Sequence, residues 1–126
     1  CYFLEDKKKL GVYSPSHKRT FCYIDDAIQM IFKIMNKKKS EGNIYNIGHQ
    51  NYEISMYNLA KLILNILKKN NSIKKFKNSP GSPIRRKPCM NKVKITNSYI
   101  SKVGLQEGIK KTYEWYKKNY FIKKND

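Results

Sequence analysis

The sequence predicts a mixed α/β fold, because short β-branched or aromatic stretches alternate along it with longer stretches of helical apolar periodicity. Its 126 residues are enough for one small domain or for part of a larger one. Apolar residues make up 40% of the chain, which is enough for a core. No apolar run approaches the roughly 18 residues of a membrane span, and no signal-peptide pattern opens the chain. We therefore expect one partial domain over residues 1–126.

The N-terminal part is expected to hold two strands and the start of a helix. A short strand over Leu10–Tyr13 leads into a turn at Ser14-Pro15-Ser16. The T-F-C-Y-I stretch Thr20–Ile24 has the β-branched and aromatic content of a second strand. Either Asp25 or Asp26 can then cap the helix that follows.

Two amphipathic helices are predicted in the middle of the chain, with a strand between them. The apolar face of the first helix consists of Ala27, Ile28, Ile31, Ile34 and Met35. A short strand bounded by glycines, Gly42–Gly48, follows. Ser55 caps the second helix. Its apolar side consists of Met56, Leu59, Leu62, Ile63, Ile66 and Leu67.

The last third is expected to begin with a strand over Ile73–Lys77. A loop over Ser79–Pro83 follows, because its two prolines cannot lie inside a helix. Helices are predicted over Asn91–Asn97 and Leu105–Asn119. We expect the last helix to bury Ile109, Thr112, Tyr113 and Tyr116 and to expose Lys110, Lys111 and Lys117.

The net charge of +18 comes from 24 lysines and only three arginines. Lysine is abundant together with asparagine and isoleucine, which indicates A/T-rich coding rather than a nucleic-acid footprint. A small basic nucleic-acid-binding domain is the alternative, but lysines occur in every segment rather than on one predicted face. The rare arginines are more informative, because a guanidinium grips phosphate bidentately and an ammonium does not. They are Arg19, Arg85 and Arg86, and we expect Arg85 to be solvated or paired with an acid.

The cysteines and histidines predict no metal site. Cys1, Cys22 and Cys89 are widely spaced without a C-x-x-C pair, and His17 and His49 lack zinc-ligand spacing. Reduced structural thiols, and hence a cytoplasmic protein, are the expectation. The chain also contains no G-x-G-x-x-G turn, so we assign it no cofactor-binding residues.

Five motifs, in order and at matching spacing, resemble the extended short-chain dehydrogenases. This family comprises the NAD-dependent nucleotide-sugar epimerases, dehydratases and decarboxylases. The motifs are Lys18–Asp26 (K-R-T-F-C-Y-I-D-D), Gly42–Gly48 (G-N-I-Y-N-I-G), Ile54–Ala60 (I-S-M-Y-N-L-A), Arg86–Pro88 (R-K-P) and Leu105–Thr112 (L-Q-E-G-I-K-K-T). The resemblance implies the C-terminal, substrate-binding portion of a Rossmann-type α/β fold, without its N-terminal dinucleotide-binding half.

Within this family the chain is most similar to UDP-glucuronate decarboxylases, including the dehydrogenase–decarboxylase half of the bifunctional polymyxin-resistance protein. The motif N-Y-E-I-S (Asn51–Ser55) and an R-K-P followed by a small residue, Cys89, carry this resemblance. It implies formation of a UDP-4-keto-pentose or UDP-xylose for lipopolysaccharide or other cell-surface sugars. Another nucleotide-sugar epimerase or 4,6-dehydratase is the alternative.

The resemblance also implies residue roles. Arg86 falls on the arginine that donates a proton after CO2 is lost, and it is the predicted catalytic residue. Ser16, His17, Lys18 and Arg19 fall on the segment that binds the UDP part of the substrate. The implied partners are a UDP-sugar and NAD, with no specific nucleic acid and no membrane, and the complete enzyme could form a homo-oligomer.

The family's glycine-rich turn, catalytic tyrosine and lysine, and acidic base are expected upstream of this chain. NAD would therefore be bound mainly by that N-terminal half. Pro80 stands where the family has a tyrosine in the loop before Arg86. We accordingly expect a fragment, a split gene or a decaying copy that has no dehydrogenase activity alone.

Overall fold

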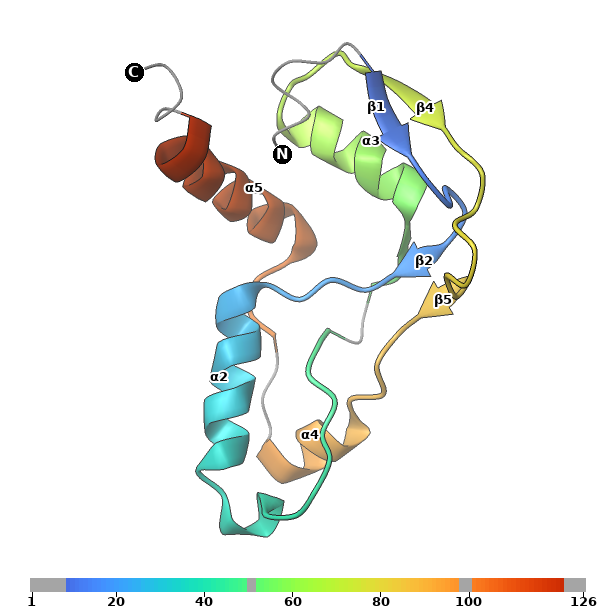
Figure 1. Ribbon diagram of the computed structural model, residues 1–126. Coiled ribbons are helices and arrows are strands. Elements are labelled where there is room, and N and C mark those ends of the chain that lie inside the picture. Colours follow the sequence, from blue (N-terminus) through green and yellow to red (C-terminus); the bar gives the residue numbers. More distant parts are fainter. Residues whose placement is uncertain (1–8, 50–51, 98–100, 122–126) are drawn as a thin grey trace.

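The computed structural model describes residues 9–49, 52–97 and 101–121 and shows two small sheets with helices around them (Figure 1). In the first sheet, β1 (Lys9–Val12) pairs in parallel with β4 (Ser72–Lys75). Helix α3 (Met56–Ile66) packs against both strands. Val12, Leu59 and Leu64 are buried in this layer.

The second sheet consists of three two-residue strands in the order β3-β2-β5. Its central strand is β2 (Lys18–Arg19), which pairs antiparallel with β3 (Ile54–Ser55) and parallel with β5 (Arg85–Arg86). The parallel register pairs Lys18 with Arg85 and Arg19 with Arg86. Because side chains alternate along a strand, each pair shares one face of the sheet.

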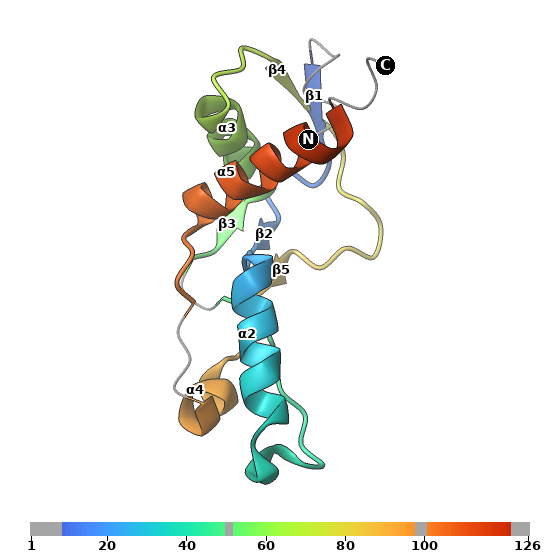
Figure 2. The same ribbon diagram turned by 90° about the vertical axis from the view of Figure 1, so that its left-hand side faces the viewer.

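A separate helical region lies beyond the two sheets (Figures 1 and 2). It contains α2 (Ile24–Met35), the short 3-10 helix η1 (Lys38–Ser40) and α4 (Asn91–Asn97), with α4 packed on α2. Its core consists of Met30, Met90 and Val93, with Cys22, Ile34, Tyr45 and Ile47 partly buried around it.

The last helix, α5 (Leu105–Tyr116), packs beside α3 and continues into a π-helical turn, η2 (Lys117–Phe121) (Figure 2). α2 and α5 are the longest helices of the described residues at 12 residues each. Both are much shorter than the roughly 20 residues that cross a bilayer, and the described chain holds no candidate membrane-spanning helix.

Several predicted elements are confirmed. β1 and β4 lie within a residue or two of their predicted places, and α4 has the predicted bounds. Ser55 caps α3, where its side chain accepts a hydrogen bond from the Asn58 amide at 3.1 Å. The predicted Ser79–Pro83 loop is also a loop, with a turn at Gly81 that has a positive φ of 71°.

Two predicted strands are wrong. Residues 20–23 and 42–48 lie outside the strands, and the second sheet uses only Lys18 and Arg19 from this part of the chain. β propensity alone does not make a strand, because the backbone groups need a neighbouring strand to pair with. In the described structure no strand lies beside either stretch.

The predicted aspartate cap of α2 is also wrong. The helix begins at Ile24, with Tyr23 as its N-cap and no side-chain hydrogen bond there. Asp26 lies inside the helix and is only 3% exposed. Its carboxylate accepts hydrogen bonds from the backbone amides of Lys102 at 3.1 Å and Val103 at 2.9 Å, which attaches the start of the α5 segment to α2.

The predicted buried helix faces are only partly correct. In α2 the buried apolar residue is Met30, whereas Ile28, Ile31 and Met35 are exposed. In α5 no residue is fully buried: Ile109 and Tyr113 are half-buried, and Thr112 and Tyr116 are exposed. The three lysines predicted on its outer face, Lys110, Lys111 and Lys117, are exposed.

Candidate functional site

A hollow of about 450 Å³ lies against the second sheet, and both Arg19 and Arg86 line it. Three segments far apart in the sequence meet there. They contribute Arg19, Thr20 and Cys22, then Asn46, Ile47, Gly48 and His49, and finally Arg86, Lys87 and Pro88. The lining includes three cationic side chains and no acidic one, so the hollow suits an anionic ligand.

The strand register brings the two arginines together. β2 and β5 are adjacent and parallel, and Arg19 lies directly beside Arg86 in the ladder. Gly48 also lines the hollow, and it lies so close to the Pro88 ring that an added Cβ would lie 2.8 Å from Pro88 Cγ. Glycine is therefore required for this close approach of the 46–49 segment to the chain that follows Arg86.

Arg19 is held in place by its own surroundings. Its Nη2 donates to Ser82 Oγ at 3.0 Å, and its Nη1 donates to the Lys18 carbonyl at 2.7 Å and, at 3.5 Å, to the Ile84 carbonyl. A guanidinium has five N–H donors, so these three bonds leave two for a ligand. Two donors are what a bidentate grip on a phosphate needs.

Arg86 contrasts with Arg19 because its side chain is exposed and makes no hydrogen bond or ion pair with any described residue. Its neighbour Lys87 lies 4.0 Å from Glu53, at the limit of an ion pair. All five N–H donors of Arg86 are therefore available to a molecule in the hollow.

The other face of the second sheet carries a different set of charges. Glu53 accepts from Arg85 with both carboxylate oxygens, including a 2.6 Å bond from Nε to Oε1. The hydrogen bond from Arg85 lowers the pKa of Glu53 below its ordinary value. The pair fixes Arg85 on this face, as the sequence predicted for an arginine paired with an acid, and leaves Arg86 on the face of the hollow.

The four predicted substrate-binding residues are consecutive in the chain but face different surroundings. Arg19 alone among them lines the hollow with Arg86. Lys18 pairs in register with Arg85, on the opposite face, and Ser16 is exposed outside the hollow. His17 is 2% exposed and lies beneath the surface, with Nδ1 3.3 Å from Ser82 Oγ.

Sequence reasoning missed three residues that shape this site: Ser82, Glu53 and Gly48. Gly48 ends the G-N-I-Y-N-I-G motif, so its close approach could have been suspected from the glycine itself. Glu53 is one of only nine acidic residues in a chain of charge +18, which marks it as a candidate ion-pair partner. Ser82 carries no sequence signal, because its contacts come from residues 63 and 65 positions away.

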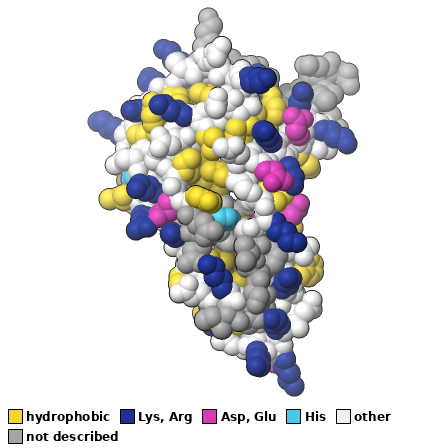
Figure 3. Space-filling model, turned by 180° about the vertical axis from the view of Figure 1, so that it is seen from behind, with side chains coloured by type: hydrophobic (Ala, Val, Ile, Leu, Met, Phe, Trp, Pro, Cys, Tyr) yellow, Lys and Arg dark blue, Asp and Glu magenta, His cyan; other side chains and the backbone are white. Residues whose placement is uncertain are grey.

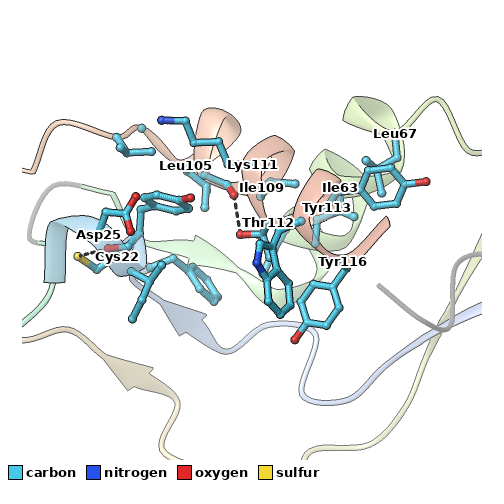
Figure 4. A pocket seen from close by; sticks show the side chains of 18 residues that line it. Cys22, Asp25, Ile63, Leu67, Leu105, Ile109, Lys111, Thr112, Tyr113 and Tyr116 are labelled. Atoms are coloured by element: carbon cyan, nitrogen blue, oxygen red, sulfur yellow. Dashed lines mark hydrogen bonds between the residues drawn. The ribbon is translucent and has the colours of Figure 1, made fainter. Parts of the chain in front are cut away.

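A larger and mainly apolar hollow of about 770 Å³ runs between α3, α5 and residues 21–25 (Figure 4). Figure 4 shows Leu67, Tyr113 and Tyr116 toward one end and Cys22 and Asp25 toward the other. Burial, more than any other cause, raises the pKa of the Cys22 thiol, which makes it a poor nucleophile. Neither Arg19 nor Arg86 lines this hollow, and its mainly apolar lining suits an apolar group better than an anion.

The tyrosine–lysine spacing Y-x-x-x-K, which is that of the family's catalytic pair, occurs three times in this chain, and the third pair, Tyr120 and Lys124, ends outside the described residues. Tyr57 and Lys61 lie on α3, where the Lys61 ammonium lies 4.9 Å from the Tyr57 ring centre. Tyr113 and Lys117 lie at the end of α5. None of these four residues lines the arginine hollow, so we assign no catalytic role to either pair.

The described residues give no indication of a metal centre, and the face in Figure 3 gives none of a nucleic-acid interface. Within residues 9–49, 52–97 and 101–121, no group of three histidine, cysteine or acidic side chains could hold a metal ion. Figure 3 shows lysine and arginine side chains distributed over the visible face, from the sheet region to the tip of the helical region, rather than gathered in one patch. That face therefore lacks the basic stripe that nucleic-acid-binding proteins use.

The fold is a portion of the Rossmann-type fold of the extended short-chain dehydrogenases. The UDP-glucuronic acid 4-epimerase of Bacillus cereus, in complex with UDP-glucuronic acid and NAD, superposes with a TM-score of 0.82. It is 28% identical, and the match covers 94% of this chain and 38% of the epimerase.

Two curated relatives have similar sequences. The dTDP-D-glucose 4,6-dehydratase of Homo sapiens is 36% identical over 97% of this chain and 36% of its own length. UDP-glucuronic acid decarboxylase 6 of Arabidopsis thaliana is 34% identical over 79% of this chain and 29% of its own length. The homologues are thus nucleotide-sugar-modifying enzymes, of which the chain spans about a third. No family model matches the chain.

The residues of this chain do not fit a dinucleotide held by the usual strand, glycine-rich turn and helix. Of the described helices, α3 follows a strand directly, but Ser55 and Met56 join the two elements without a glycine. α2 follows Tyr23 and α5 follows Gly104, neither of them the end of a strand. The described residues therefore contain no turn of this kind for a dinucleotide.

Proposed function

We propose that this chain is the substrate-binding portion of an NAD-dependent enzyme that modifies a nucleotide sugar. The arginine hollow would hold the diphosphate and the sugar of that substrate. The observation that carries the proposal is the register of β2 and β5, which sets Arg19 beside Arg86 at one hollow with no acid in its lining.

The chemistry of the two arginines supports a diphosphate ligand. A nucleoside diphosphate presents several anionic oxygens in a short span, and guanidinium groups match phosphate geometry bidentately. Arg19 keeps two N–H donors and Arg86 keeps five, so together they can bind two neighbouring anionic groups. A UDP-sugar fits this requirement, and a uronic acid would add a carboxylate to it.

The particular reaction that we propose is decarboxylation of UDP-glucuronate to a UDP-4-keto-pentose or UDP-xylose. Once C4 carries a ketone, the sugar is a β-keto acid, and it loses CO2 because the ketone accepts the electron pair. The resulting enolate then takes a proton at C5. Arg86 is the residue that we propose as its donor, because it is exposed at the hollow and has no partner among the described residues.

A second candidate is dehydration of dTDP-D-glucose, in which no CO2 is lost. It is favoured by the human relative, whose similarity extends over 97% of this chain. The two substrates differ in their nucleobase, and only the first has a carboxylate on its sugar. The ligand that the chain prefers therefore separates the two candidates. UDP-glucuronate should bind better than dTDP-glucose under the first proposal and worse under the second.

The proposal is tested by titrating UDP, UDP-glucuronate, dTDP and dTDP-glucose calorimetrically into the 126-residue chain. We expect Arg19→Gln and Arg86→Gln each to weaken UDP-glucuronate binding about tenfold or more, since each removes hydrogen bonds to a charged group. Lys110→Gln is the matched control, because it removes the same charge from the exposed side of α5.

That control variant should change the affinity less than twofold. Equal losses of affinity in all three variants would mean that binding depends only on the overall charge of +18, and the proposal would fail. In that case single-stranded oligonucleotides should bind as well as the nucleotide sugars do, as the basic-domain alternative requires.

A further inference from the structure

Ser82 joins a buried histidine to one of the two arginines at the hollow. Its Oγ accepts a hydrogen bond from Arg19 Nη2 at 3.0 Å and lies 3.3 Å from His17 Nδ1. Ser82 belongs to the loop before β5, whereas His17 and Arg19 flank the first residue of β2. One hydroxyl thus connects two segments that are more than 60 residues apart in sequence.

The direction of the Arg19 bond follows from the chemistry of the side chains. Arginine has donors only, so the Ser82 oxygen must accept from Arg19. A hydroxyl has one donor proton and two acceptor lone pairs, so the contact between Ser82 and His17 Nδ1 can run in either direction, set by the tautomer of His17. In both directions His17 contacts the same oxygen that accepts from Arg19 and restricts its movement.

The backbone of the loop fixes the position of this hydroxyl. The Ser82 amide donates to the Ser79 carbonyl at 3.2 Å across a turn in which Gly81 has a φ of 71°. The Ser79 amide donates in turn to Ser14 Oγ at 2.9 Å, and Ser14 is buried. The Ser79 end of the turn is thus bonded to buried Ser14, and the Ser82 end contacts buried His17.

We propose that Ser82 is a positioning residue that holds the Arg19 guanidinium in the orientation that binds a nucleoside diphosphate in the hollow. This inference rests on the proposed function and adds a residue to it. An unrestrained arginine loses considerable rotamer entropy when it binds a phosphate. Arg19 has lost much of that freedom before the ligand arrives, whereas Arg86 has not.

The contrast between the two arginines gives them different parts in binding. Arg19 is half-buried and bonded on three sides, so it offers a fixed pair of donors for a phosphate. Arg86 is exposed and has no partner among the described residues, so its side chain can change rotamer when a ligand binds. Removal of the Ser82 hydroxyl should therefore reduce affinity through Arg19 alone.

The experiment compares Ser82→Ala, Ser82→Thr and Ser79→Ala in the 126-residue chain, with UDP and inorganic pyrophosphate as the probes. We expect Ser82→Ala to weaken both ligands about five- to tenfold, since one hydrogen bond to a charged group is lost. Ser82→Thr keeps the hydroxyl and should stay within twofold. Ser79→Ala is the matched control, because its side chain makes no hydrogen bond that links the loop to Arg19.

A double-mutant cycle separates positioning from a general loosening of the loop. In an Arg19→Gln background, Ser82→Ala should weaken UDP binding no further. A further loss in that background, wild-type affinity in Ser82→Ala, or a loss for UDP but not for pyrophosphate would each overturn the inference. If Arg19→Gln itself leaves UDP binding unchanged, the proposed function fails first, so the two failures are distinguishable. Thermal unfolding of each variant verifies that it is folded.

Discussion

The two regions of the molecule are held together by different forces. The helical region of α2, η1 and α4 has a small apolar core of Met30, Met90 and Val93. The second sheet has strands of only two residues, and polar side chains tie its loops and strands together. Apolar packing is non-directional, whereas hydrogen bonds place particular atoms. The region that must orient two arginines is thus the one that relies on directional contacts.

Helix α2 shows the same contrast on a single element. One side buries Met30 against α4. The other side carries exposed apolar residues at helical spacing: Ile24, Ile28, Ile31, Phe32 and Met35. Apolar periodicity therefore identifies a helix correctly, but it does not decide which of two apolar sides is covered.

The largest expected effect tests this difference between the sides of α2. Met30→Ala should lower the free energy of unfolding by about 2–5 kcal/mol, because it leaves a cavity where the side chain is now 2% exposed. Met35→Ala, five residues further along α2 and 72% exposed, is the control and should cost less than about 1 kcal/mol. Urea titration followed by circular dichroism measures both. Equal costs would show that the two sides of α2 do not differ in burial.

The next effect concerns the polar attachment between α2 and the segment that leads into α5. Asp26→Asn keeps the shape of the side chain but removes its charge from hydrogen bonds to the Lys102 and Val103 amides. We expect a loss of about 1.5–3 kcal/mol, the range for hydrogen bonds to charged groups. The exposed neighbour supplies the matched variant, Asp25→Asn, which should be close to neutral. A neutral Asp26→Asn would mean that the attachment does not stabilise the fold.

What the sequence predicts well is local, and what it misses depends on pairing between distant segments. The α4 bounds, the Ser55 cap and the Ser79–Pro83 loop follow from propensities and capping within a few residues. The Gly42–Gly48 strand fails because a strand needs a partner that the described structure does not supply. Local signals alone therefore give the elements but not the sheets.

The same distinction holds for the candidate site. The scarcity of arginine pointed to Arg19 and Arg86 without any knowledge of the register that sets them side by side. The sequence could not tell that Lys18 would face the opposite way or that His17 would be buried, because the facing of a strand depends on what covers each side. The role of Ser82 could not be predicted either, because its contacts come from residues 63 and 65 positions away.

The smallest expected effect tests the ion pair that fixes β5 in the sheet region. Glu53 is 13% exposed at its side chain, and Arg85 lowers its pKa in the folded protein. A lowered folded pKa means that the pair stabilises the fold fully above the unfolded pKa, about 4.3. The contribution is lost as the pH falls through the lower folded value.

Wild type should therefore be slightly more stable than Glu53→Gln at pH 7, and the difference should decline below the ordinary pKa of a glutamate and vanish below the lowered folded pKa of Glu53. Urea titrations between pH 3 and pH 8 measure this difference. Glu114→Gln, on the exposed part of α5, removes the same charge elsewhere and corrects for the overall charge. A difference that persists unchanged into acid would show that Glu53 acts through packing rather than charge, and the contrast between a polar sheet region and an apolar helical region would weaken accordingly.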